Sequence, residues 1–146
     1  MDLLQVLWCP NEHWGPPMSG QPEGGPMLLV EWRRAAEAGG RGLRVPEPPV
    51  RSEERLVPRT CLIETEETAE RVPISRYDVW KVGGLPRWST TDAYAYECAD
   101  CDWAPMELLL TVSSGDVTGV DIGRGGELRI FRCPRDLGHG YHVDLQ

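Results

Sequence analysis

The stretch CADCDWAPMELLLTV, residues 98–112, joins two closely spaced cysteines to an apolar run. Its second part, residues 105–112, predicts a β-strand whose consecutive leucines indicate burial on both faces. ELRIFR, residues 127–132, predicts a second strand that ends at Cys133 and Pro134. The residues between them are rich in glycine, so we expect the two strands to be joined as a hairpin.

Four potential metal ligands flank these two strands. In an antiparallel pair, the start of one strand lies beside the end of the other. Cys98 and Cys101 precede the first strand, whereas Cys133 and His139 follow the second. All four are therefore expected to gather at one end of the sheet. Three thiolates and an imidazole form a typical closed donor set for structural Zn²⁺, so the sequence predicts a zinc-binding knuckle.

Two alternatives to this interpretation remain open. His142 also follows the second strand and would be able to replace His139. We favour His139 because glycines flank it in an expected turn, whereas His142 falls in a segment that resembles a terminal strand. Cys98 and Cys101 also have the spacing of a redox pair, but the acidic side chains around them oppose thiolate formation unless a cation is bound.

The remainder of the chain predicts a single domain, residues 1–146, of the α+β class. We expect it to be mostly β, with small antiparallel sheets, short helices and the knuckle at one end, because 13 prolines and 16 glycines disfavour long helices. Further strands are expected at residues 2–8, 27–36 (ending as a short helix), 59–65 and 77–82. Residues 37–58 form a Pro/Gly-rich connection that we expect to be mobile. The similar segments LLQVLWCP and LRIFRCP are compatible with two degenerate repeats, although short apolar words also recur by chance.

The charge balance bears on the partner. With 23 acidic and 15 basic side chains the formal net charge is −8, which disfavours nucleic acid and anionic membranes as partners. We expect a protein partner with a basic surface, although such a charge also serves solubility. No run approaches the roughly 18 apolar residues of a membrane span, and the first residues lack the features of a signal peptide. A cytoplasmic location with reduced cysteines is therefore expected.

Other residues with chemical potential are less specific. Cys9 and His13 are compatible with a packed turn, part of a metal site or a catalytic pair, and no group that would orient a catalytic base is evident. Cys61 lies in an apolar segment and is expected in the core. Trp88 and Trp103 flank the cysteine pair and are expected to bind the partner, with packing into the core as the alternative for both and especially for Trp88.

Three segments, KVGGLPRW, CADCDWAPMELLL and LRIFRCP, resemble the YwqG-like domain family of bacteria. The first residues, LLQVLWCPNEHW, look like the opening of its actinobacterial-type branch. The matching residues are Lys81, Gly83, Gly84, Pro86, Trp88, Cys98, Cys101, Met106, Phe131, Cys133 and Pro134. The resemblance is best over residues 77–139, and Thr111 departs from the glutamine common in such strands. A more distant similarity is to the programmed-cell-death-two proteins, whose relatives are chaperones for a ribosomal protein. The resemblance implies a β-rich fold with a metal-stabilised end and no established reaction.

Two functions follow as hypotheses. The first is a non-catalytic, zinc-stabilised protein-binding module, such as a chaperone, an adaptor or an immunity-type protein. The second is a metal-dependent or Cys/His-dependent enzyme. Four protein ligands would favour the first, because a catalytic metal keeps a coordination position open for water or substrate.

Overall fold

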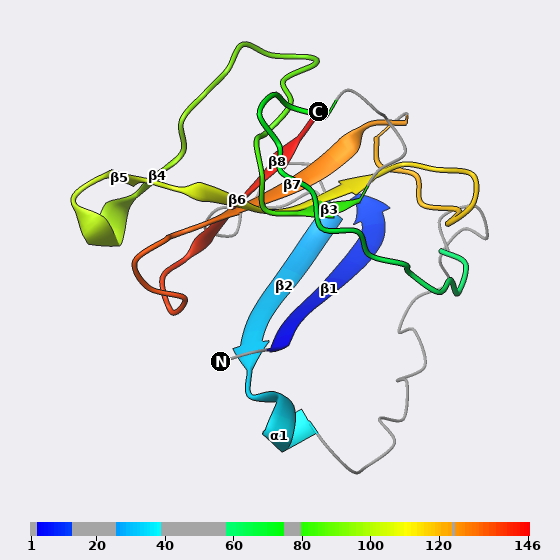
Figure 1. Ribbon diagram of the computed structural model, residues 1–146, viewed down its shortest axis with the longest axis horizontal. Coiled ribbons are helices and arrows are strands. Elements are labelled where there is room, and N and C mark those ends of the chain that lie inside the picture. Colours follow the sequence, from blue (N-terminus) through cyan, green and yellow to red (C-terminus); the bar gives the residue numbers. More distant parts are fainter. Residues whose placement is uncertain (1–2, 13–25, 39–57, 75–79, 124) are drawn as a thin grey trace.

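The computed structural model describes residues 3–12, 26–38, 58–74, 80–123 and 125–146. As predicted, this part of the chain is mostly β, with small antiparallel sheets and little helix (Figure 1). The central sheet has four strands in the order β3-β6-β7-β8. These strands are β3 (Lys81–Val82), β6 (Glu107–Ser113), β7 (Glu127–Arg132) and β8 (Tyr141–Leu145). Within these residues, no helix has the length and apolar character needed to cross a bilayer.

Strands β6 and β7 form the predicted antiparallel hairpin. Glu107 lies opposite Arg132 at one end of the pair, and Ser113 lies opposite Glu127 at the other. A β-bulge interrupts the register between Leu108 and Leu110. Most residues of both strands are buried, which was predicted for residues 105–112 from their run of leucines. The hairpin is therefore the centre of the sheet and determines which residues meet at its ends.

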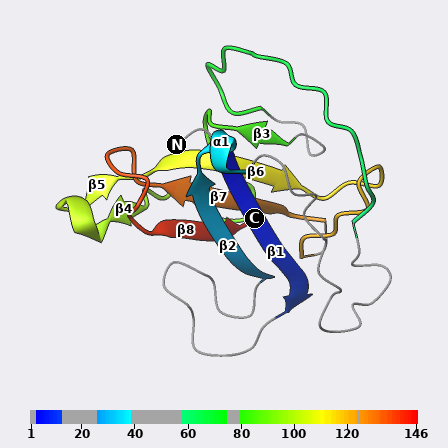
Figure 2. The same ribbon diagram turned by 90° about the horizontal axis from the view of Figure 1, so that it is seen from below.

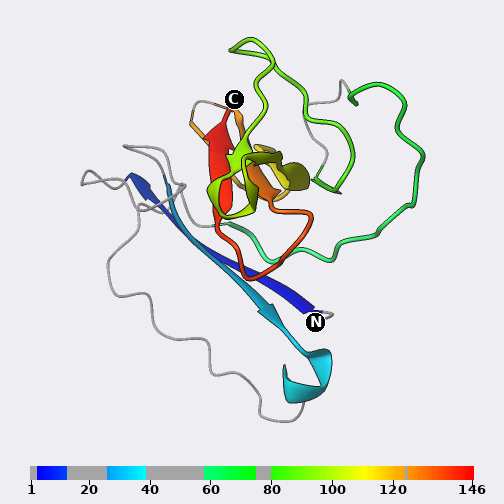
Figure 3. The ribbon, with the colours of Figure 1, turned by 90° about the vertical axis from the view of Figure 1, so that its left-hand side faces the viewer.

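A second hairpin covers one face of this sheet. It consists of β1 (Leu3–Glu12) and β2 (Pro26–Arg33), and it crosses the face seen in Figure 2. Strand β2 runs into the short helix α1 (Ala35–Ala38), which confirms the predicted change from strand to helix. Figure 3 shows the hairpin as a layer separate from the four-stranded sheet. The buried apolar residues between the layers and around the β6–β7 connection are Leu28, Leu109, Val112, Val120, Ile122, Leu128, Ile130 and Val143.

The opposite face of the sheet is polar and aromatic, yet it is also buried. Arg129 in the middle of β7 is fully buried and forms an ion pair with Asp144 of β8. Its guanidinium group lies 4.1 Å from the centre of the Trp88 ring and donates a hydrogen bond to the carbonyl oxygen of Arg87. The segment containing these two residues thus covers the polar face, above the sheet in the view of Figure 1.

Hydrogen bonds fix this covering segment to the sheet. The side-chain oxygen of Gln146 accepts hydrogen bonds from the backbone N–H groups of Ser89 and Thr90, each at 3.1 Å. Arg87 forms an ion pair with the buried Glu127 at 2.8 Å. Because buried polar groups are costly without partners, these contacts allow a polar face to be enclosed.

Residues 59–65 do not form the predicted strand. Arg59 donates its backbone N–H to the carbonyl oxygen of Thr118 at 2.7 Å, but the residues that follow are extended and exposed, with Leu62 fully exposed. Cys61 is also exposed, so its predicted place in the core is wrong. The apolar character of this segment was misleading because no ladder of backbone hydrogen bonds holds it against a sheet. Most of the connection at 37–58, and residues 77–79 of the strand predicted at 77–82, lie outside the described residues.

The buried ion pair gives a prediction about stability. Arg129→Ala should lower the free energy of unfolding by about 3–5 kcal/mol, because the largely buried Asp144 carboxylate would lose its cation. Urea unfolding followed by tryptophan fluorescence measures this loss. Arg132→Ala in the same strand is the matched control. Arg132 lies 3.6 Å from the exposed Glu107, so its removal should cost less than about 1 kcal/mol, and equal losses for both variants would contradict the assignment.

Candidate metal centre

The two cysteines of the first pair lie in a tight reversal of the chain. β4 (Glu97–Cys98) pairs with β5 (Ala104–Pro105), and the single 3₁₀ turn η2 (Ala99–Cys101) lies between them. The turn closes with a hydrogen bond from the Trp103 backbone N–H to the Cys98 carbonyl oxygen at 3.1 Å. Asp102 and Trp103 both have left-handed backbones, with φ of 51° and 60°. This local geometry places the thiols of Cys98 and Cys101 in one knuckle.

The second ligand pair lies in the loop between β7 and β8. Cys133 directly follows β7, and His139 lies two residues before β8. Asp136 shapes this loop, because its carboxylate accepts a hydrogen bond from the Gly138 backbone N–H at 2.8 Å. The His139 backbone N–H in turn donates to the Asp136 carbonyl oxygen at 3.4 Å. The imidazole is thereby turned back toward the end of β7.

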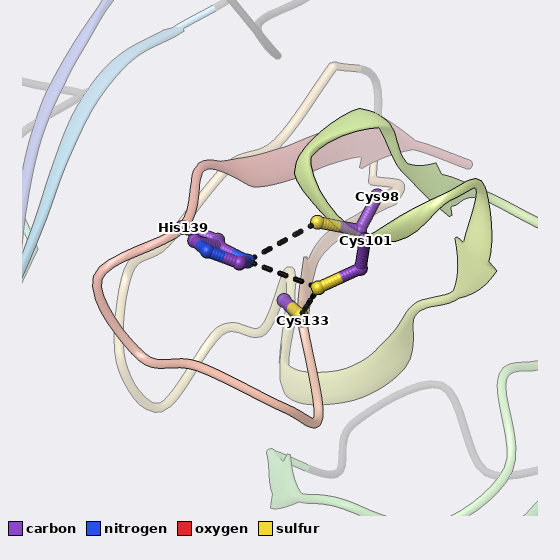
Figure 4. Close-up of side chains that lie close together, drawn as sticks. All are labelled: Cys98, Cys101, Cys133 and His139. Atoms are coloured by element: carbon purple, nitrogen blue, oxygen red, sulfur yellow. Dashed lines mark hydrogen bonds between the residues drawn. The ribbon is translucent and has the colours of Figure 1, made fainter.

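The four side chains converge on one point, as Figure 4 shows. Their ligand atoms all lie within 4.8 Å of one another, which is close enough to hold a metal ion. The sulfurs of Cys101 and Cys133 are 3.6 Å apart, and His139 Nδ1 lies 3.3 Å and 3.6 Å from the sulfurs of Cys101 and Cys98. With bond lengths of about 2.3 Å to sulfur and about 2.0 Å to nitrogen, a tetrahedral ion requires edges of about 3.8 Å and 3.5 Å. These three distances lie close to the tetrahedral edges, and the other pairs of ligand atoms are within 4.8 Å, so the cluster is close enough to hold one ion.

Groups behind the ligands orient them. The backbone N–H of Arg135 donates to the sulfur of Cys133 at 3.4 Å. Asp136 lies 3.9 Å from Nε2 of His139, so the ring nitrogen that faces away from the sulfurs has a carboxylate neighbour. This separation is too long for a hydrogen bond, so the carboxylate acts on the ring only through its negative charge. Sequence reasoning missed Asp136, although an acidic residue three positions before the histidine was a usable signal.

The thiols differ in their affinity for protons. Burial raises the pKa of Cys101 to about 11, together with the neighbouring thiols of Cys133 and Cys98. Burial opposes ionisation of Cys133 as well, but hydrogen bonds from the backbone of Asp136 and Arg135 and from His139 outweigh it and lower the pKa of Cys133 to about 6. The Cys133 and Asp136 side chains raise the pKa of His139. Cys133 thus ionises more readily, whereas Cys101 would have to release its proton to solvent when a cation binds.

The structure brings together the four residues that the sequence singled out as ligands and leaves His142 and Cys9 elsewhere. His142 lies in β8 and stacks on the ring of Tyr96 with centroids 3.8 Å apart, and burial lowers its pKa. Cys9 lies in β1 opposite Met27 and is not in the cluster. His13 lies outside the described residues.

The two tryptophans expected to bind a partner have different surroundings. Trp103 projects from the knuckle with 66% of its surface exposed. Trp88 is partly buried on the polar face, where its ring contacts Arg129 and lies 6.4 Å from that of Phe131. The packing expected as the alternative for Trp88 is therefore present, and Trp103 is the more accessible of the two.

No family model, no curated protein and no solved structure matches this chain. Its function therefore has to be inferred from the geometry of its own residues.

The cluster predicts one bound divalent ion per chain, and its loss in Cys101→Ser. The hydroxyl group is a poor replacement for a thiolate ligand, and metal binding is coupled to folding of the knuckle. Elemental analysis of purified protein measures the metal content, and thermal unfolding measures the accompanying loss of stability. Cys61→Ser is the matched control, because Cys61 is exposed and outside the cluster. Its metal content should equal that of the wild type.

The histidines refine the same test. His139→Ala should lose metal, whereas His142→Ala should retain it despite losing its contact with Tyr96. Full metal occupancy in Cys101→Ser or His139→Ala would mean that the ligand set is wrong.

Proposed function

We propose that this protein is a non-catalytic, zinc-stabilised module that binds another protein. The observation that supports the proposal is the convergence of three thiols and one imidazole, whose ligand atoms lie within 4.8 Å of one another. Four protein ligands leave no coordination position for water or substrate, which favours a structural role over a catalytic one. A chaperone, an adaptor or an immunity-type protein would fit this description.

Zinc is the metal that we propose for this site. Thiolates are soft ligands, which disfavours Mg²⁺ and Ca²⁺, and a tetrahedral S₃N set is typical of structural zinc. The need for an ion is supported by the weak local packing of the knuckle. η2 contains no buried residue, and β4 pairs with β5 over two residue pairs. A reducing cytoplasm would keep the thiols available to the metal.

A basic partner is supported by the charges around the knuckle. Glu97, Asp100 and Asp102 are exposed there, within six residues of the accessible Trp103. Arg135 is a nearby cation, but its side chain is directed to the carbonyl oxygen of Cys101 at 3.4 Å. Carboxylates would attract a basic surface, and an exposed tryptophan on a metal-held turn would supply an apolar anchor.

The alternative hypothesis is an enzyme that uses the metal or the pair Cys9 and His13. It requires either a three-ligand site with bound water or a base that is held beside the Cys9 thiol. The four-donor cluster disfavours the first arrangement. For the second, Cys9 is placed within β1, and the position of His13 is outside the described residues. The relationship to YwqG-like domains stays a prediction beside this proposal.

The identity of the metal has its own test. We expect zinc at a molar ratio near one in protein purified without added metal. Replacement by Co²⁺ should give the visible absorption bands of a tetrahedral thiolate complex. Removal with a chelator should abolish these bands and lower the melting temperature, because the binding energy of such sites, on the order of 10 kcal/mol, contributes to folding. Iron or an octahedral cobalt spectrum would refute the zinc assignment.

The proposed binding function is tested by affinity capture from lysate at low and high salt, with Trp103→Gly beside the wild type. Glycine suits the left-handed backbone at position 103, so this variant should retain metal and stability while losing the aromatic anchor. We expect a basic protein to be captured at low salt, and capture to fall both at high salt and in the variant. Recovery of nucleic acid with no protein partner would contradict the proposal.

A further inference from the structure

A cleft opens on the sheet next to the metal centre. Its volume is about 530 Å³, and β6 residues Glu107–Leu109 form part of its floor. One wall is the turn at 83–86 that follows β3, and the other is the segment 94–96 that leads into the knuckle. None of the four candidate metal ligands lines this cleft, so it is a separate feature.

The cleft exists because β3 leaves the edge of β6 early. β3 pairs with Leu110 and Thr111, and a last backbone hydrogen bond joins Gly83 N–H to the Leu109 carbonyl oxygen at 2.9 Å. Gly83 and Gly84 then turn the chain away, both with positive φ. Among the described residues, no strand continues this edge past Leu109. Such a gap offers backbone hydrogen-bonding groups to an extended ligand.

The wall at the double glycine is held in position. The buried carboxylate of Glu70 accepts hydrogen bonds from Leu85 N–H and from the Lys81 ammonium group, each at 2.7 Å. Burial alone would raise the pKa of Glu70, but these hydrogen bonds and that from Ile74 N–H outweigh it and lower the pKa. At Gly84, a Cβ atom would collide with the Glu70 carboxylate. The wall is therefore preformed, which lowers the entropic cost of binding.

The lining combines exposed apolar groups with negative charge. Leu85 is 40% exposed on one wall, and Tyr94 is 65% exposed on the other, where its ring lies 5.1 Å from that of Tyr96. Glu107 on the floor has a 60% exposed side chain. Exposed Asp92 and Glu97 lie within two residues of the tyrosine wall.

The cations beside the cleft are already engaged. Lys81 is bound by Glu70, and Arg87 is bound by Glu127. Arg132, which also lines the cleft, lies 3.6 Å from Glu107, and its side chain is 31% exposed against 60% for Glu107. The exposed carboxylates of Glu107, Asp92 and Glu97 outnumber this one partly exposed cation, so the net charge at the rim is negative.

We propose that this cleft binds a basic segment of a partner protein in extended conformation and anchors one arginine side chain. The guanidinium group would stack on Tyr94 and pair with Glu107, while its aliphatic stem would contact Leu85. The backbone of the segment would form hydrogen bonds to the gap in the β6 edge. This proposal rests on the proposed protein-binding function and assigns it a site distinct from Trp103.

The test is an NMR titration of the full-length, metal-loaded chain with a capped five-residue peptide. The peptide alternates threonine and valine around a central arginine, and a matched peptide has the neutral isostere citrulline instead. We expect the backbone signals of Gly84, Leu108 and Leu109 to shift, and the citrulline peptide to bind about tenfold more weakly. Tyr94→Ala and Glu107→Gln should each weaken binding of the arginine peptide several-fold. Glu66→Gln, which removes another exposed carboxylate outside the cleft, should leave binding unchanged.

Equal affinity for the two peptides would overturn the arginine assignment. Shifts confined to the knuckle and the Trp103 indole would overturn the cleft as the site while leaving the protein-binding function intact. If neither peptide binds but a basic protein is captured from lysate, the cleft is likewise refuted as the site and the protein-binding function stands. If the affinity capture also recovers no protein, the proposed function itself fails.

Discussion

The antiparallel pairing of β6 with β7 is the constraint on which the rest of the structure depends. Because Glu107 lies opposite Arg132, the residues just before β6 are placed beside those just after β7. Cys101 and Cys133 are distant in sequence, yet their sulfurs come within 3.6 Å at this end. A register shift of one residue would move alternate side chains to the other face of the sheet and break this convergence.

Both faces of the paired strands β6 and β7 are buried. Leu128 and Ile130 pack in the apolar core, whereas Arg129 between them must enter the opposite layer. A fully buried guanidinium group is tolerable because Asp144, the Arg87 carbonyl oxygen and the Trp88 ring all contact it. The segment that carries Arg87 and Trp88 is therefore needed to enclose Arg129. Without this segment the Arg129 guanidinium group would lose two of its contacts.

The predictable and unpredictable parts of the structure differ in the range of the interactions that determine them. The ligand set could be predicted because cysteine spacing is local and a hairpin supplies the single long-range contact needed. His139 could be preferred over His142 because His142 was expected within a strand. In the structure His142 lies in β8, and its ring stacks on Tyr96 on the polar side of the sheet. By contrast, ELRIFR does not reveal that Arg129 is buried, because the same alternation fits a strand with one solvated face. The strand predicted at residues 59–65 is absent for a related reason. An apolar segment forms a strand only where the edge of a sheet is available for pairing.

The candidate metal centre and the cleft are supported by the same strands, although they are lined by different residues. Met106 and Arg132 both line the cleft, and each is one residue from an element of the knuckle, β5 on one side and Cys133 on the other. A tetrahedral ion at the cluster would fix the start of β6 against the end of β7, and it would thereby fix two parts of the cleft lining. The cleft wall at residues 83–86 does not depend on the ion, because hydrogen bonds from Lys81 and Leu85 to Glu70 position it. An ion held by four protein ligands has no position for substrate. By fixing the ends of β6 and β7, it would instead keep the unpaired edge of β6 accessible to a partner, so a structural metal would support binding without a catalytic role.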